Sequence, residues 1–144
     1  MLVRLAVVDG QGGGIGRLIV EKIRAEFGEA VNILGLGTNA VATSMMLKAG
    51  ANEGATGENA VIFSSDRVDY ILGSVAIIAA NSFAGELTPR MAEAIASSRA
   101  TKVLLPINRN GIEIAGNFDE PLPLQVDNLV VRVRRLLNER KQER

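Results

Sequence analysis

Residues 7–16 read Val-Val-Asp-Gly-Gln-Gly-Gly-Gly-Ile-Gly, so five glycines stand between one apolar segment and the next. Before them, residues 2–8 form a short run rich in Val and Leu, which is typical of a buried parallel strand. After them, apolar residues recur every three or four positions from Ile15 to Phe27, which predicts an amphipathic helix that Gly28 ends. A buried strand that turns through glycines into a helix indicates an α/β protein in which a phosphate can approach main-chain amides.

The segments that follow repeat this alternation. A second strand is predicted at residues 31–36, and Thr38 and Asn39 supply the turn and cap of a helix that Gly50 ends. Residues 50–59 are small and polar, which predicts one long irregular loop. This loop is long and glycine-rich enough to close over a ligand.

Later elements are predicted from shorter patterns. Thr88 and Pro89 begin a helix that continues to about Ser98, and Pro121 and Pro123 precede a final amphipathic helix. Residues 75–80 either extend a strand or begin a helix, because periodicity alone does not separate the two. Further strands are predicted at 60–64, 69–74 and 102–107, with a short edge strand at 112–115.

Strands that alternate with helices imply right-handed crossovers and a sheet covered on both faces. The predicted fold is therefore a small Rossmann-like three-layer α/β sandwich with a mostly parallel sheet of about five strands. The length of 144 residues suits a single domain spanning 1–144, in which 131–144 form the basic end of the last helix and the tail.

The composition excludes much chemistry, because the chain contains no His, Cys or Trp. It can form no disulfide, thiol nucleophile or zinc-finger site, and it has no imidazole base. We therefore predict no metal site. Any proton transfer would have to come from carboxylates, Lys, Tyr, water or the ligand itself.

Sixteen basic and sixteen acidic side chains cancel, although residues 132–144 carry six basic and two acidic groups. That segment has no aromatic residue to stack on a base, so a solvated helix end is favoured over a nucleic-acid site. The most apolar stretch, residues 70–80, is too short to cross a bilayer, and the first residues resemble no secretion signal. A cytoplasmic protein is predicted, with no membrane partner.

The glycine spacing is Gly10-x-x-x-Gly14-x-Gly16, which resembles the cofactor loop of short-chain dehydrogenases. The exact G-x-G-x-x-G and Walker A patterns are absent. The resemblance ends there, because those enzymes use a Tyr-x-x-x-Lys pair and Tyr70 is followed four positions later by Ser74. An NAD-binding fold also places an acid about 20 residues after its glycines, whereas residues 35–39 contain none.

Ligands of parallel sheets bind outside the carboxyl ends of the strands. The glycine stretch could also serve only to let strand and helix pack closely, and the Asn side chains could be ordinary turn and capping residues. The residues predicted to bind a ligand are Asp9, Gly10, Gln11, Gly12, Gly13, Gly14, Ile15, Gly16, Thr38, Asn39, Asn81 and Asn108.

The catalytic residues cannot be named from the sequence, although Asp9 and Glu58 are weak candidates for a general base. Asp9 could bind a metal ion, orient a ribose or act as a base, and it could equally cap the glycine turn. Glu58 lies on the predicted loop at 50–59, and Glu86 is a further carboxylate near the strand ends.

Four segments, at 7–16, 36–43, 48–59 and 88–98, resemble a family of small uncharacterised bacterial proteins. The resemblance covers roughly residues 4–127. It implies no reaction and no catalytic residues, because that family is a domain of unknown function.

The first functional hypothesis is a protein that binds a nucleotide or another phosphorylated metabolite at the glycine turn, with a nucleotide or dinucleotide as the cofactor class considered. The second is a non-enzymatic regulatory or assembly protein with an architectural glycine turn. The third is a carboxylate-based enzyme that acts on a phosphorylated substrate. A homo-oligomer is predicted because the amphipathic last helix could pair between subunits.

Overall fold

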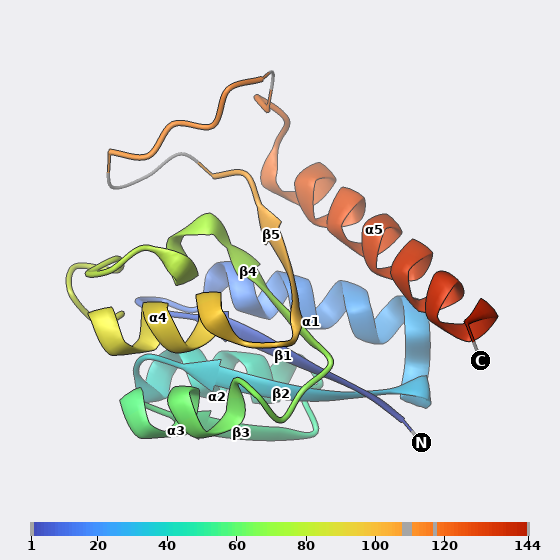
Figure 1. Ribbon diagram of the computed structural model, residues 1–144, viewed down its shortest axis with the longest axis horizontal. Coiled ribbons are helices and arrows are strands. Elements are labelled where there is room, and N and C mark those ends of the chain that lie inside the picture. Colours follow the sequence, from blue (N-terminus) through green and yellow to red (C-terminus); the bar gives the residue numbers. More distant parts are fainter. Residues whose placement is uncertain (1, 108–110, 117, 144) are drawn as a thin grey trace.

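The computed structural model describes residues 2–107, 111–116 and 118–143 and contains one five-stranded sheet (Figure 1). Every strand pair in these residues is parallel, in the order β3-β2-β1-β4-β5. The α/β fold and its parallel sheet confirm the predicted fold class. The strands are β1 (Val3–Asp9), β2 (Val31–Gly37), β3 (Glu53–Thr56), β4 (Tyr70–Ser74) and β5 (Thr101–Leu105).

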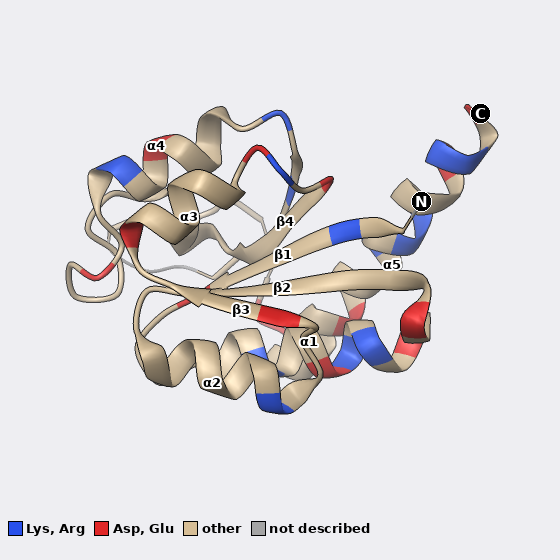
Figure 2. Cartoon of the chain, turned by 90° about the horizontal axis from the view of Figure 1, so that it is seen from below, with Lys and Arg blue, Asp and Glu red and all other residues tan. Residues whose placement is uncertain are grey.

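Helices cover both faces of the sheet, and Figure 2 shows α1 and α2 on one side and α3 and α4 on the other. The last helix packs on the α1 side, and a 3-10 helix, η2 (Val75–Ile78), joins the side of α4. A second 3-10 helix, η1 (Gly28–Ala30), links α1 to β2. The α-helices are α1 (Gly14–Phe27), α2 (Ala40–Ala49), α3 (Glu58–Ser64), α4 (Pro89–Ser97) and α5 (Leu122–Gln142).

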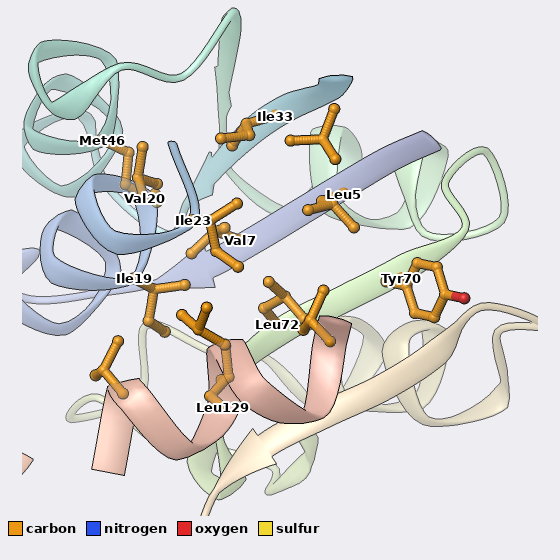
Figure 3. Close-up of a cluster of buried hydrophobic side chains, with 14 of the residues drawn as sticks. Leu5, Val7, Ile19, Val20, Ile23, Ile33, Met46, Tyr70, Leu72 and Leu129 are labelled. Carbon is orange, nitrogen blue, oxygen red and sulfur yellow. The ribbon is translucent and has the colours of Figure 1, made fainter. Parts of the chain in front are cut away.

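The central strand divides its side chains between two apolar clusters. Leu5 and Val7 point to the cluster that contains residues of α1 and α5, as Figure 3 shows, and Ala6 and Val8 belong to the cluster on the α4 side. All four are fully or almost fully buried. Because both faces of β1 are buried at residues 5–8, this part of the strand is continuously apolar instead of alternating.

The prediction for residues 50–64 is wrong. The third strand is β3, inside the expected irregular loop, and the expected strand at 60–64 lies in α3. β3 reads Glu-Gly-Ala-Thr and has no apolar pattern, because it is an edge strand whose glycine packs on α2. A Cβ added to Gly54 would lie 2.7 Å from Cγ2 of Thr43.

Two further predictions also need correction. Residues 75–78 form η2, which is neither a continuation of β4 nor the start of an α-helix. In the expected edge strand at 112–115, Ile112 makes only an isolated bridge. The helix start at Thr88 is confirmed, since its hydroxyl accepts a hydrogen bond from the Met91 amide at 3.2 Å.

The basic end of α5 is tied to the body of the protein. Arg134 pairs with Glu26 on α1, and Arg140 pairs with Asp69 at 3.0 Å between nitrogen and oxygen. The hydrogen bond to Asp69 raises the pKa of the Arg140 guanidinium. These pairs use two of the cations that a nucleic-acid surface would need.

In the described part of the chain, no helix has the length and apolar character needed to span a bilayer.

Candidate ligand-binding site

The strand order changes direction beside β1. β1 is followed by α1 on one face and pairs with β2, whereas its other neighbour, β4, leads to α4 on the opposite face. Such a switch point leaves a crevice at the carboxyl ends of the strands, where open α/β sheets bind ligands. Three segments meet there: the glycine turn after β1, Thr38 and Asn39 after β2, and residues 79–88, which we call the strap.

The glycine turn brings two helices close together. The Gly13 amide donates to the Gly10 carbonyl at 3.0 Å, and Gly13 is the N-cap residue of α1, with a φ of 76°. A Cβ on Gly13 would lie 2.8 Å from Cα of Ala42 on α2. Gly13 therefore has both a conformational and a packing reason to be glycine.

Asp9 is only 4% exposed, and its carboxylate binds the turn from within. Oδ1 accepts from the Gly10 amide at 2.8 Å, and Oδ2 accepts from the Gly16 amide at 2.6 Å. These bonds satisfy a donor in the first turn of α1 that would otherwise lack a partner. Among the roles that the sequence leaves open for Asp9, its contacts support the capping role.

Gly12 and Gly14 differ from the other glycines of the turn. Both are exposed and neither has a positive φ. Apart from the adjoining backbone, no heavy atom of the described residues lies within 4 Å of a Cβ added at either position. Within that part of the chain, the amides of Gly14 and Ile15 donate no hydrogen bond. The start of α1 therefore presents open amides at the positive end of its dipole.

A carboxylate occupies the donors next to this turn. Oε1 of Glu86 accepts from the Gln11 amide at 2.8 Å, the Thr38 hydroxyl at 2.6 Å and the Asn39 side-chain amide at 2.9 Å. We call these three donors the anion cradle. The hydrogen bond from Thr38, followed by that from Gln11, lowers the pKa of Glu86, so this carboxylate is ionised at neutral pH.

Asn39 holds the cradle in place. Its Oδ1 accepts from the Ala42 amide at 2.9 Å, which caps α2 as the sequence predicts. Its Nδ2 donates to the Gln11 carbonyl at 3.0 Å as well as to Glu86. One side chain thus links the glycine turn, the start of α2 and the strap.

The strap, the yellow-green loop at the left of Figure 1, has an unusual backbone. Asn81, Phe83 and Ala84 have φ values of 69°, 58° and 56°, in the left-handed region that residues with a Cβ seldom adopt. Phe83 is buried, and a Cβ on Gly10 would lie 2.7 Å from its ring. The strap therefore covers the end of β1 with an aromatic ring.

The carboxylate of Glu58, a candidate base, makes contacts that join two helices. It lies in the first turn of α3, not on an irregular loop, which corrects the expected covering segment. The Thr88 hydroxyl donates to its Oε2 at 2.6 Å, and Arg90 pairs with its Oε1 at 3.3 Å. Glu58 thus ties the start of α3 to the start of α4.

The structure brings together most of the predicted site residues. Asp9 to Gly16, Thr38 and Asn39 lie in one place, and Asn81 is exposed at the start of the strap. Asn108 lies outside the described residues. The sequence indicates Glu86 only as a carboxylate near the strand ends. Its contacts with Gln11, 75 positions away, and with Thr38, 48 positions away, are apparent only in the fold.

The sheet order, the helices on both faces and the glycine turn define a Rossmann-like α/β protein. The chain belongs to the family described as a domain of unknown function (DUF3842), whose model matches residues 4–138. This membership confirms the family resemblance found in the sequence. No curated protein matches the chain.

Solved structures similar to this chain include a universal stress protein in complex with cAMP, at 17% identity and a TM-score of 0.41, covering 72% of this chain and 97% of that one. A universal stress protein from Archaeoglobus fulgidus has 13% identity and a TM-score of 0.41, covering 72% and 98%. At this distance no residue role is transferred to the present chain.

Proposed function

We propose that this protein binds a small phosphorylated molecule, of the nucleotide or sugar-phosphate class, at the carboxyl ends of β1 and β2. The observation that carries the proposal is the anion cradle, where three donors converge on one oxygen of the Glu86 carboxylate. A charged oxygen with three donors is the type of recognition that anionic ligands receive in proteins.

The glycine turn supplies the second part of the site. In this proposal the ligand phosphate lies between the anion cradle and residues 12–16, where the amides of Gly14 and Ile15 face open space at the start of α1. A side chain at position 12 or 14 would fill that space, although neither the backbone conformation nor the packing requires glycine there. The close approach of a ligand to the main chain explains why glycine occupies both positions.

The test is a panel of inorganic phosphate, AMP, ATP, NAD and glucose 6-phosphate, measured by thermal shift and titration calorimetry. A probe at 100 times its dissociation constant stabilises the fold by about 2.7 kcal/mol. We expect at least one phosphorylated probe to bind and its unphosphorylated counterpart to bind far more weakly. Equal response to both counterparts, or no response in the whole panel, contradicts the proposal.

We assign no reaction to the site, because both candidate bases hold structural hydrogen bonds. Asp9 binds two amides of the glycine turn, and Glu58 binds Thr88 and Arg90. These contacts engage both oxygens of each carboxylate. The proposal is therefore one of binding.

A second candidate function, assembly with another copy of the chain, rests on α5. Leu124 and Val131 are 50% and 68% exposed and lie seven residues apart, on one face of the helix. Burying this face between two copies would remove both apolar side chains from water. We expect light scattering to show a dimer that Val131→Glu dissociates and that Val41→Glu, at a position on α2 that is 60% exposed, leaves intact. A monomeric wild-type protein at micromolar concentration excludes this assembly.

A further inference from the structure

Glu86 belongs to the strap, yet it occupies donors that belong to the turns after β1 and β2. Its Oε1 takes the Gln11 amide, the Thr38 hydroxyl and the Asn39 amide, all within 2.9 Å. A phosphoryl oxygen requires the same donors and carries the same sign of charge. The two groups therefore exclude one another, both by occupancy and by repulsion.

We propose that Glu86 is an internal competitor of the ligand: an anionic group of the ligand displaces the Glu86 carboxylate from the anion cradle, and the strap opens. This inference rests on the function proposed above and adds its regulation. The carboxylate marks where the anionic group binds. The closed strap sets how tightly that group is bound.

The backbone of the strap supports two states. Asn81, Phe83 and Ala84 are held in the left-handed region, where the Cβ of an L-residue crowds the backbone. Such conformations persist only when surrounding contacts impose them, and they cluster at switch segments. Releasing the strap relieves this crowding.

Two sets of contacts hold the strap closed. Glu86 is anchored in the cradle, and Phe83 is 6% exposed with its ring against Gly10 at the end of β1. The Asn81 amide donates to the Leu87 carbonyl at 2.7 Å, and the Leu87 amide donates to the Ser82 carbonyl at 3.0 Å. These two hydrogen bonds belong to the closed conformation of the strap, and they open when its anchors release and its backbone leaves the left-handed region.

Under this competition, the apparent affinity of the ligand equals its intrinsic affinity multiplied by the fraction of molecules whose cradle is free. Removing the competitor must therefore strengthen binding. The direction of this change in affinity distinguishes a competitor from a residue that contacts the ligand, whose removal weakens binding. It also distinguishes a competitor from a simple structural anchor, whose removal leaves the affinity unchanged.

The experiment titrates inorganic phosphate and the tightest phosphorylated probe of the panel into wild-type, Glu86→Ala and Glu86→Gln protein. We expect affinity about tenfold higher for Glu86→Ala, as for a strap that is closed in about nine molecules of ten, with Glu86→Gln in between. Glu29→Gln is the matched control, because Glu29 is exposed in η1 and its loss changes the net charge equally. The control should bind as the wild type does.

Hydrogen exchange of the wild-type protein gives a measurement that needs no variant. The ligand should accelerate exchange of the Asn81 and Leu87 amides while it protects those of Gly14 and Ile15. Protection of all four amides would overturn the inference.

The outcomes separate the two proposals. If no probe binds the wild type or Glu86→Ala, the proposed function fails. If probes bind both with equal affinity, or bind Glu86→Ala more weakly, the function stands and the competitor is wrong. Binding to Glu86→Ala alone supports both proposals.

Discussion

Asp9→Asn should lower the free energy of unfolding by about 3 kcal/mol, because the variant loses a charged acceptor between two buried amides. The carboxylate of Asp9 accepts from Gly10 at 2.8 Å and from Gly16 at 2.6 Å. A carboxamide has one acceptor oxygen, so its NH₂ group would face one of these N–H donors. The affected donor is then left without a partner in a site that is 4% exposed.

Thermal and urea denaturation measure this loss, which corresponds to about 10 °C in Tm for a chain of this size. Asp66→Asn is the matched control, because Asp66 is exposed and accepts a single amide, that of Arg99. The control should stay within about 0.5 kcal/mol of the wild type. Equal stability of Asp9→Asn and the wild type would show that the Asp9 cap contributes little.

Gly16→Ala and Gly14→Ala should change stability in opposite directions, although the two sites are two residues apart. At Gly16, the new methyl group would lie 2.8 Å from Cβ of Asp9 and 2.9 Å from Sδ of Met46. Forcing it in displaces the Asp9 cap and the contact between α1 and α2, at a cost of about 3 kcal/mol. At Gly14 the methyl group meets open space, and alanine gains up to about 1 kcal/mol by restricting the unfolded chain.

Urea denaturation of the two variants side by side tests this contrast. Since both substitutions add one methyl group to the first turn of α1, the difference reports the local packing alone. Equal destabilisation at the two positions would mean that Gly14 is also a packing residue. The glycine turn would then be architectural, as the second hypothesis from the sequence holds.

The sequence is informative where one segment carries its own pattern. Residues 5–8 of β1 are continuously apolar because both faces are buried there, and α1 shows a helical period because one face is buried. The turn between them is marked by its own run of glycines, although the atoms that Gly10 and Gly13 pack against, in Phe83 and Ala42, lie far along the chain. These features made the α/β fold and the glycine turn predictable.

Residues 50–64 were mispredicted because their structure depends on neighbours elsewhere in the chain. β3 has no apolar alternation and is defined by pairing with β2, from Leu34 opposite Glu53 to Gly37 opposite Thr56. The apolar residues of α3 span less than two helical turns, too few to show a period. The sequence therefore predicted an irregular loop where β3 lies and a strand where α3 lies.

Long-range polar contacts are equally hidden. Arg24 falls on a polar face of α1 by sequence, yet its guanidinium donates to the carbonyls of Gly28, Val31 and Gly50. Glu86 reaches the Gln11 amide across 75 positions. Composition and spacing identify such residues as charged, and only the fold shows which donors or acceptors they meet.

The central claim is that the open glycines receive a ligand phosphate, and titration of Gly14→Val with the tightest phosphorylated probe tests it most directly. A Cβ at position 14 meets no described atom within 4 Å beyond the adjoining backbone, so the variant should fold with a Tm close to that of the wild type. We predict that its affinity falls at least about tenfold, because the side chain covers the amides that face the phosphate. A folded Gly14→Val protein that binds the probe as tightly as the wild type would contradict the account.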